Sequence, residues 1–380
     1  MKPIIQIIDT LNVGGAQKLL VTMAEVLRRR DETLTVISLD NRDSPIQHQL
    51  HALNVPVLNV RGRNKLFDPQ RVWQIAEFLR QGEFDVIHTH LTHANILGTL
   101  AGRLAGVPVA ASLHNVRLDR RQHSQFKEWL ENTILRYCTH RVIAVGYVVE
   151  EAYRKQLGGK RIEVIPNAVS AIPALPLAER LSIRTGLVGD PERPLLIAVG
   201  RLTPQKGYPD LFTALTMLRQ SQPSLALIIA GEGRHESKLR QQIADLSLSE
   251  NVFLLGRRDD VPDLLAASDI YVSAALWEGL SVATLEAMAA GLPVVATSVG
   301  EVPRMIVAGA GIVVPPRDPA ALAQALASLL DSPASRQAMG VAARAYVLRH
   351  HEANAWVQRL LRLYAELRAS ARPVLSREHI

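Results

Sequence analysis

The sequence predicts an α/β protein of two tandem domains, each built on a doubly wound parallel sheet. First, its 380 residues exceed the size of one ordinary hydrophobic core. Second, short apolar runs alternate with amphipathic stretches along nearly the whole chain, as in strand–helix units. Third, this alternation breaks over residues 166–194, which hold five prolines and no clear strand. We therefore expect a linker there, between Rossmann-like domains over residues 1–170 and 171–354.

Each strand is expected at a short run rich in Val, Ile and Leu, the pattern of a buried parallel strand. The runs are 4–8, 34–39, 55–60, 84–88, 107–114 and 141–145 in the first domain, and 194–200, 225–231, 252–256, 269–274, 292–298 and 311–315 in the second. Amphipathic patterns predict helices at 16–30 and 69–81, and a helical tail from about 335 to 372. The tail's last helix, about 355–372, is expected to pack back on the first domain. Ligands of such sheets bind beyond the carboxyl ends of the strands, so we expect the site in the cleft between the domains.

The composition is typical of a globular protein, and we expect a cytoplasmic one. Hydrophobic residues make up 48% and charged residues 21% of the chain. No apolar run reaches the roughly 18 residues needed to span a membrane, and the first residues lack a secretory pattern. Cys138 is the single cysteine, which excludes an intramolecular disulfide and a cysteine-based zinc site.

The net charge of +7 is concentrated in the first half, where residues 1–170 carry +6 and residues 171–380 carry +1. Aromatic residues are only 4%, and no recognition-helix or zinc-finger signature occurs, so no nucleic-acid partner is expected. A basic first domain suits anionic lipid headgroups or a phosphorylated substrate. Scattered solvated arginines that aid solubility are the alternative.

Two short motifs are candidate anion sites. DTLNVGGAQ follows a strand and opens a helix, so Gly14 and Gly15 would let the backbone and the helix amides approach a phosphate. AVGRLTPQKGYPD places Arg201 and Lys206 just after a strand, where they could neutralise two phosphate charges. An ordinary tight turn and a pair of surface cations are the respective alternatives.

The stretch LWEGLSVATLEAMAAGLPVVATS carries two glutamates in small and apolar surroundings. We expect a loop with Glu278 and then a helix that Ser281 caps, with Glu286 in its second turn. Amides from Gly279 to Val282 would hold a phosphate, Glu286 the hydroxyls of a ribose, and Glu278 those of a sugar. A capping carboxylate would explain one glutamate but less readily two.

His88, His90 and His93 lie within six residues and raise the question of a metal. His88 and His90 would share one face of a strand, while His93 would begin a helix. No carboxylate has a ligand-like spacing and no Asp-x-Asp occurs, so no metal is predicted. His114 ends the fifth strand, where it either faces the cleft or is a satisfied edge histidine.

Together these pieces resemble retaining glycosyltransferases of family 4, which have the GT-B fold, over nearly the whole chain. The most specific part is EGLSVATLEAMAAGLPVV, with two glutamates seven residues apart followed by Ala-Met-Ala-x-Gly-x-Pro-Val; GRLTPQKG, FDVIHTH, SLHN and VIPNAV also resemble the family. Several positions depart from the family pattern: Gly146, Ala168, Ser170, Glu301 and Arg304. The departures at Glu301 and Arg304 fall in a loop that usually helps hold the donor.

The resemblance implies a role for each candidate. Arg201 and Lys206 would bind the donor diphosphate and stabilise it as it leaves. Glu286 would bind the nucleotide ribose and Glu278 the donor sugar, while His114 would contact that sugar and help organise the transition state. The remaining donor contacts would come from Gly14, Gly15, Gly279, Leu280, Ser281 and Arg257, the last near the base.

The predicted function is therefore the metal-independent, retaining transfer of a sugar from a nucleotide-diphosphate sugar, with UDP-sugar first and GDP-sugar second. No cofactor is expected. The acceptor would be a saccharide or lipid-linked molecule of envelope, capsule, lipopolysaccharide or exopolysaccharide synthesis. Basic residues at 117–121, Arg61, Arg63, Lys65 and Lys127 suggest a peripheral enzyme on the inner face of the cell membrane, with a soluble acceptor as the alternative.

Two other functions compete with this prediction. A nicotinamide-dependent oxidoreductase would share the α/β architecture, but the G-x-G-x-x-G fingerprint is missing. A non-catalytic nucleotide-sugar-binding module would keep the donor residues and lose the acceptor side.

Overall fold

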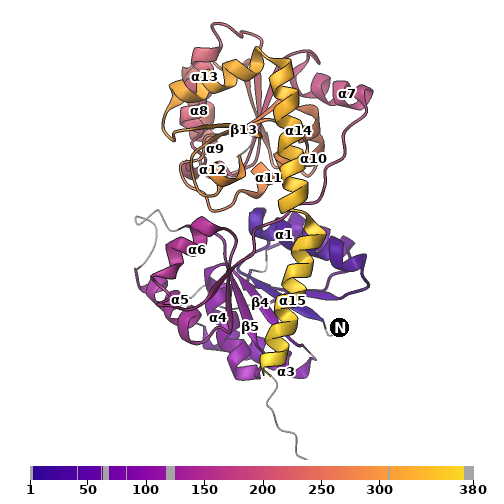
Figure 1. The fold of residues 1–380 in the computed structure, drawn as a ribbon, viewed down its shortest axis with the longest axis vertical. Coiled ribbons are helices and arrows are strands. Elements are labelled where there is room, and N and C mark those ends of the chain that lie inside the picture. The colour runs from indigo at the N-terminus through magenta and orange to yellow at the C-terminus, as the bar shows by residue number, and fades with distance from the viewer. Residues whose placement is uncertain are drawn as a thin grey trace, which may run out of the picture. The chain divides into compact units, whose positions relative to one another are not determined.

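The computed structural model describes residues 3–40, 42–60, 62, 68–82, 84–116, 125–306 and 309–371. The chain divides into two units. The first unit is Met1–Asn167 together with Ala353–Ile380, and the second is Ala168–Glu352. In Figure 1 the first unit runs from indigo to magenta and includes the yellow helix near the C-terminus, while the second runs from magenta to orange.

The first unit is built on a seven-stranded parallel sheet with the order β3-β2-β1-β4-β5-β6-β7. Its strands are β1 (Ile4–Ile8), β2 (Leu34–Ser38), β3 (Val57–Asn59), β4 (Ile87–His90), β5 (Val109–Leu113), β6 (Arg141–Ala144) and β7 (Ile162–Val164). Six of these fall on the predicted runs. The seventh, β7, was not predicted, because three half-buried residues on a sheet edge are too few to stand out as an apolar run.

Helices cover both faces of this sheet (Figure 1), as expected of a doubly wound fold. They are α1 (Gly15–Arg28), α2 (Pro45–Ala52), α3 (Pro69–Gln81), α4 (Thr92–Ala105), α5 (Gln125–Tyr137), α6 (Tyr147–Arg154) and α15 (Ala353–Ala371). Helix α3 illustrates how nearby residues determine where a helix begins. The Asp68 side chain accepts hydrogen bonds from the amides of Gln70 and Arg71, and Pro69 is the first residue of the helix. Its buried face carries Val72, Ile75, Ala76 and Leu79.

The second unit is built on a six-stranded parallel sheet with the order β10-β9-β8-β11-β12-β13. Its strands are β8 (Leu195–Val199), β9 (Ala226–Ala230), β10 (Val252–Gly256), β11 (Ile270–Ser273), β12 (Val294–Thr297) and β13 (Gly311–Val314). Its helices are α7 (Leu177–Val188), α8 (Tyr208–Leu218), α9 (Glu236–Asp245), α10 (Val261–Ala267), α11 (Val282–Ala289), α12 (Val302–Met305), α13 (Pro319–Leu330) and α14 (Pro333–His350), with the 3₁₀ turn η1 (Pro204–Lys206). All six predicted strands are present, so the prediction of two tandem parallel-sheet domains is confirmed.

The predicted helical tail consists of two helices. Helix α14 ends at His350 and α15 begins at Ala353, at the residue where the chain returns to the first unit. There α15 packs against α1. The C-terminal helix therefore belongs to the hydrophobic core of the first unit.

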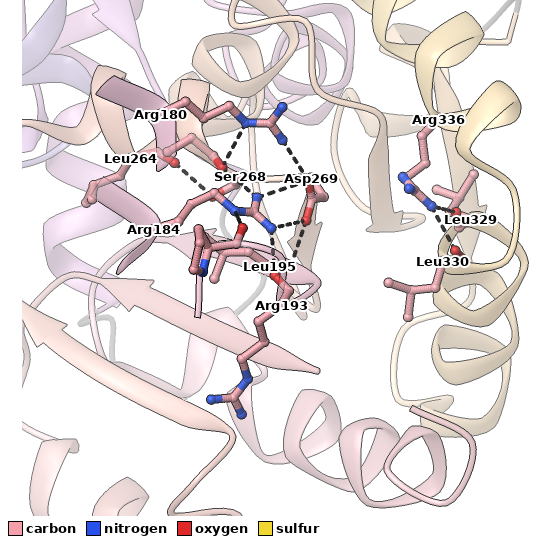
Figure 2. A network of polar contacts seen from close by, with 12 residues as sticks. Arg180, Arg184, Arg193, Leu195, Leu264, Ser268, Asp269, Leu329, Leu330 and Arg336 are labelled. Carbon is pink, nitrogen blue, oxygen red and sulfur yellow. Dashed lines mark hydrogen bonds and ion pairs between the residues drawn. The ribbon is translucent and has the colours of Figure 1, made fainter. Parts of the chain in front are cut away.

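The proline-rich stretch 166–194 contains α7, which a partly buried polar network links to the second sheet (Figure 2). Asp269, just before β11, accepts bonds from Arg180 at 2.8 Å, from Arg184 at 3.1 Å and from the amide of Leu195 at 2.8 Å. The guanidinium of Arg184 also donates to the carbonyl of Ala267 at 2.9 Å. Because Leu195 begins β8, this network lies at the amino ends of β8 and β11.

Both sheets reverse their strand order beside their first strand, between β1 and β4 and between β8 and β11. Such a switch point opens a crevice beyond the carboxyl ends of the two strands, where ligands of doubly wound sheets bind. The loops that follow β1, β4, β8 and β11 are therefore the first places to look for a site.

Candidate active site

In the second unit, the loops that follow β8 and β11 are bonded to each other at the switch point. The amide of Leu276 donates to the carbonyl of Gln205 at 2.7 Å, and the Gln205 side chain donates to the carbonyl of Trp277 at 2.9 Å. These bonds place the cationic loop after β8 directly against the acidic loop after β11.

Lys206 and Glu278 form an ion pair in this position. Lys206 Nζ lies 2.5 Å from Glu278 Oε1, and the two side chains are only 17% and 11% exposed. The structure therefore brings together the two candidates that the sequence assigned separately to a phosphate and to a sugar. Arg201 lies in the same loop as Lys206, and it is exposed.

Two glycines allow the close approaches at this site, Gly207 in the loop after β8 and Gly300 in the loop after β12. Gly207 has φ +62°, and a Cβ built on it would lie 1.9 Å from the carbonyl oxygen of Ala274. Gly300 has φ +54°, and its Cβ would lie 2.2 Å from the carbonyl oxygen of Gly279. Both positions combine a left-handed backbone with a neighbouring backbone that cannot yield, so only glycine fits.

Helix α11 follows the Glu278 loop as predicted. It begins at Val282, and the Ser281 hydroxyl accepts a bond from the amide of Thr284 at 3.3 Å, which makes Ser281 its N-cap. Glu286 lies half-buried in the second turn. The amide of Glu301 donates to the carbonyl of Gly279 at 2.9 Å, so the departure from the family pattern at Glu301 sits beside the Glu278 loop.

Arg257 lies farther from this cluster. It follows β10, and β9 separates β10 from β8 in the sheet. The Arg257 side chain is exposed. The structure thus does not place Arg257 next to Lys206 and Glu278.

In the first unit, Asp9 follows β1 and binds the start of α4. Its Oδ1 accepts a bond from the amide of Ala94 at 2.6 Å, and its Oδ2 accepts from the amide of His93 at 3.2 Å. The ring Nδ1 of His93 lies 3.1 Å from the same carboxylate. His93 is thus part of a capping arrangement at the N-terminus of α4. Gly14 is the N-cap of α1 in an extended conformation and contributes no side chain to the helix start.

The other three histidines of this unit's switch region form a cluster in which His88 and His90 are buried and His114 is half-buried. His88 and His90 share one face of β4, as predicted, with ring centroids 4.2 Å apart, and His90 Nδ1 lies 2.9 Å from His114 Nε2. Burial lowers the pKa of His88 to about 3 and the pKa of His114 to about 4, and it lowers the pKa of His90 well below its usual value. All three rings are therefore neutral at physiological pH.

Within the described residues, no group of three or more His, Cys, Asp or Glu side chains is placed to hold a metal ion. His88 and His90 each use both ring nitrogens in hydrogen bonds to other protein groups. Over the same residues, no helix is long and apolar enough to cross a membrane.

Four residues of these networks were not predicted from the sequence: Gln6, Asp9, Gln205 and Tyr364. Gln6 is fully buried and lies in the otherwise aliphatic strand IIQII, which is the one signal that could have drawn attention to it. The basic residues 61, 63, 65 and 117–121, predicted to face a membrane, lie outside the described residues.

Comparisons with known proteins identify the family to which both units are similar. Residues 180–346 match the family described as Glycosyl transferases group 1, and residues 13–171 match Glycosyltransferase Family 4. A phosphatidyl-myo-inositol mannosyltransferase of Mycobacterium leprae is 30% identical over 95% of both chains. The UDP-Gal:α-D-GlcNAc-diphosphoundecaprenol α-1,3-galactosyltransferase of Escherichia coli is 28% identical over 76% of this chain and 77% of its own. The crystal structure of Anabaena HepE with UDP and glucose superposes with a TM-score of 0.86 at 22% identity, over 96% of this chain and 100% of that one.

Proposed function

The chain belongs to glycosyltransferase family 4 and has the GT-B fold, and we propose that it transfers a sugar, with retention of configuration, from a nucleotide-diphosphate sugar to a lipid-linked saccharide. The observation that carries the proposal is the Lys206–Glu278 pair at the switch point of the second sheet. The pair places a cation, which can bind phosphate, beside a carboxylate, which can bind hydroxyl groups. A nucleotide sugar carries its diphosphate and its sugar hydroxyls next to each other.

The donor diphosphate would take Lys206 from Glu278 and also engage Arg201. Positive charge held at the leaving group stabilises the charge that builds there as the glycosidic bond breaks. Two side-chain cations can supply this charge, so we propose a metal-independent reaction. The amides of Gly279, Leu280 and Ser281, before and at the start of α11, would add hydrogen bonds to phosphate or sugar.

Glu278, released from Lys206, would accept hydrogen bonds from the donor sugar, and Glu286 would accept them from the ribose. From the first unit we assign the amides of Gly14 and Gly15 to the donor phosphate and His114 to the donor sugar. Arg257 would lie near the base, away from the phosphate loop, because β9 separates its strand from β8.

Retention follows if the acceptor attacks the face from which the nucleotide leaves. The bond from the anomeric carbon to the diphosphate oxygen breaks, and the bond to the acceptor oxygen forms on the same face. The acceptor's proton passes to the departing phosphate oxygen, which balances the step without a protein nucleophile. UDP is the first choice of nucleotide, because HepE was crystallised with UDP and glucose and the E. coli relative is named for UDP-Gal; GDP is the second.

A lipid-linked acceptor would place the enzyme at the inner face of a membrane. The two relatives are named for a phosphatidyl-inositol and an undecaprenol-linked acceptor. On α5, Phe126 and Trp129 stack on each other although they are 63% and 60% exposed, and the first domain carries the excess of positive charge. Aromatic side chains beside cations are suited to a headgroup layer.

Flotation with anionic liposomes at low salt tests this placement. The wild type should float, and Trp129→Ala should lose most of the binding, whereas Trp73→Ala, which removes another exposed tryptophan of the same unit, should keep it. Failure of the wild type to float would contradict the membrane placement and favour a soluble acceptor.

The transfer reaction itself is tested by supplying UDP-sugars and GDP-sugars and measuring nucleotide release with and without acceptor. Lys206→Ala should abolish release while the protein remains folded, and Lys238→Ala, an exposed lysine on α9, should leave it unchanged. The anomeric configuration of the product, read by NMR, tests retention. Donor binding without any nucleotide release would favour the non-catalytic module, and full activity of Lys206→Ala would refute the assigned site.

A further inference from the structure

A chain of buried hydrogen bonds in the first unit ends at His114. Its members come from four elements: Gln6 on β1, His88 and His90 on β4, Ser112 on β5 and Tyr364 on α15. Each of these five side chains is almost completely buried. Buried polar atoms must pair with one another, so the direction of each bond depends on its neighbours.

The orientation of the Gln6 side-chain amide determines the donor and the acceptor in each of these hydrogen bonds. Its Nε2 lies 3.5 Å from the sulfur of Met23 and 3.1 Å from the hydroxyl of Tyr364, and its Oε1 lies 2.6 Å from His90 Nε2. The thioether sulfur of Met23 has lone pairs and no proton, so it can accept from an NH₂ group but can donate nothing to a carbonyl oxygen. Met23 therefore favours the orientation in which Gln6 Oε1 faces His90.

The tautomer of His114 follows from this orientation. Since Gln6 Oε1 can only accept, His90 Nε2 carries the proton, and His90 Nδ1 of the neutral ring can only accept. The partner of His90 Nδ1 is His114 Nε2 at 2.9 Å, which must then be the donor. The proton of neutral His114 is thereby held on Nε2, and its Nδ1 carries the lone pair.

The hydrogen bonds on the other side of Gln6 have the same donor-to-acceptor direction. The Tyr364 hydroxyl accepts from Gln6, so its own proton goes to His88 Nδ1 at 2.6 Å. His88 Nε2 then donates to the hydroxyl of Ser112 at 2.7 Å. Five consecutive bonds thus share one direction, from His114 through His90, Gln6, Tyr364 and His88 to Ser112. A reversed Gln6 amide would reverse them all and would move the His114 proton to Nδ1.

We propose that Gln6 is a positioning residue that holds His114 in the Nε2-protonated tautomer, so that His114 Nδ1 is a hydrogen-bond acceptor for a hydroxyl group of the donor sugar. The assignment of the ligand rests on the proposed function, whereas the tautomer rests on the hydrogen bonds of the first unit alone. Gln6 touches no reacting atom and acts through His90.

Two-bond ¹H–¹⁵N correlation spectra of the labelled protein report the tautomer of each histidine. The His114 signals are assigned by their loss in His114→Asn. In the wild type, His114 should be protonated on Nε2. Gln6→Met, which preserves the volume and removes both hydrogen-bonding atoms, should give a mixture of the two tautomers. Tyr364→Phe leaves Gln6 Oε1 on His90, so His114 should keep its tautomer there.

Kinetics then separate positioning from loss of structure. Gln6→Met should lower kcat in proportion to the loss of the Nε2-protonated tautomer, by at most about tenfold, which is the effect of losing one hydrogen bond, with the Kd of UDP unchanged. Thr99→Val is the matched control, because it breaks a buried Thr99–Thr139 hydrogen bond of the same unit that is not connected to the hydrogen bonds of Gln6 and His114. It should change neither the tautomer of His114 nor kcat.

A wild-type His114 protonated on Nδ1, or a Gln6→Met protein with an unchanged tautomer, would overturn the proposal. The wild-type spectrum decides the first point even if Gln6→Met fails to fold. If instead the tautomers are as expected but no nucleotide sugar is turned over, the proposed function fails and the role of Gln6 in holding His114 stands.

Discussion

The Lys206–Glu278 pair predicts that removing both charges costs hardly more stability than removing either charge alone. The perturbations are Lys206→Met, Glu278→Gln and the double variant. Breaking a fully buried ion pair costs about 3–5 kcal/mol and breaking an exposed one about 0–1 kcal/mol. Both side chains retain some exposure, 17% and 11%, so we expect about 2 kcal/mol for each single variant.

The double variant should cost little more than either single variant, which gives a coupling energy of about 2 kcal/mol. The reason is structural: the bonds of Gln205 to Leu276 and Trp277 hold the two loops together. Neither remaining charge can therefore swing freely into solvent when its partner is removed.

Hydrogen exchange of β8 and β11, followed by mass spectrometry, measures the stability of the second unit alone. The matched control is the exposed pair of Glu236 and Arg240 on α9, at 2.8 Å, for which the same cycle should give less than about 1 kcal/mol. Additive single costs at Lys206 and Glu278, with no coupling, would refute the reasoning. Saturating UDP should reduce the coupling, because phosphate then replaces Glu278 as the partner of Lys206.

Two further predictions concern acid stability and loop packing. His88, His90 and His114 have pKa values below the unfolded value of 6.5, so as pH falls the unfolded chain binds protons first and stability is lost from pH 6.5 downward. At about pH 5.5 each of the three histidines should lower the free energy of unfolding by about 1 kcal/mol, so urea unfolding of the first unit should be less favourable to the folded state than at about pH 7.5. A flat pH profile would contradict neutral burial. Gly207→Ala should raise the Kd of UDP by at least about tenfold in titration calorimetry, because its Cβ would collide with Ala274 and displace the Lys206 loop; unchanged affinity would argue against that loop as the phosphate site.

The sequence was sufficient to predict the strands and the fold class, because buried parallel strands are dense in Val, Ile and Leu wherever they occur. It also predicted the loop with Glu278 and the cap at Ser281, since both depend on residues close in the chain. The strand β7 was missed because it is short and lies at a sheet edge, where pairing with β6 rather than composition makes it a strand.

Contacts between distant residues were not predictable in this way. Gln6 and Tyr364 are 358 positions apart, and only the return of α15 to the first unit brings them together. Lys206 and Glu278 were identified from their positions at strand ends, but their direct pairing depends on the adjacency of β8 and β11, which strand order alone reveals. A single sequence shows the residues that take part in such contacts, but their pairing depends on the order of the strands in the fold.

The polar side chains at the two switch points differ in charge: those of the second unit form an ion pair, and those of the first unit are neutral. In the second unit, Lys206 and Glu278 form an ion pair, and we propose that an anionic ligand replaces Glu278 as the partner of Lys206. In the first unit, desolvation keeps His88, His90 and His114 neutral. These rings carry no charge, and what the network fixes is which nitrogen donates and which accepts a hydrogen bond. A charged diphosphate requires a charged partner, whereas an uncharged hydroxyl can also be bound by a neutral one. It follows that added salt should weaken binding of the nucleotide diphosphate strongly and should hardly alter selection among sugars, because screening acts on the ion pair and not on neutral hydrogen bonds.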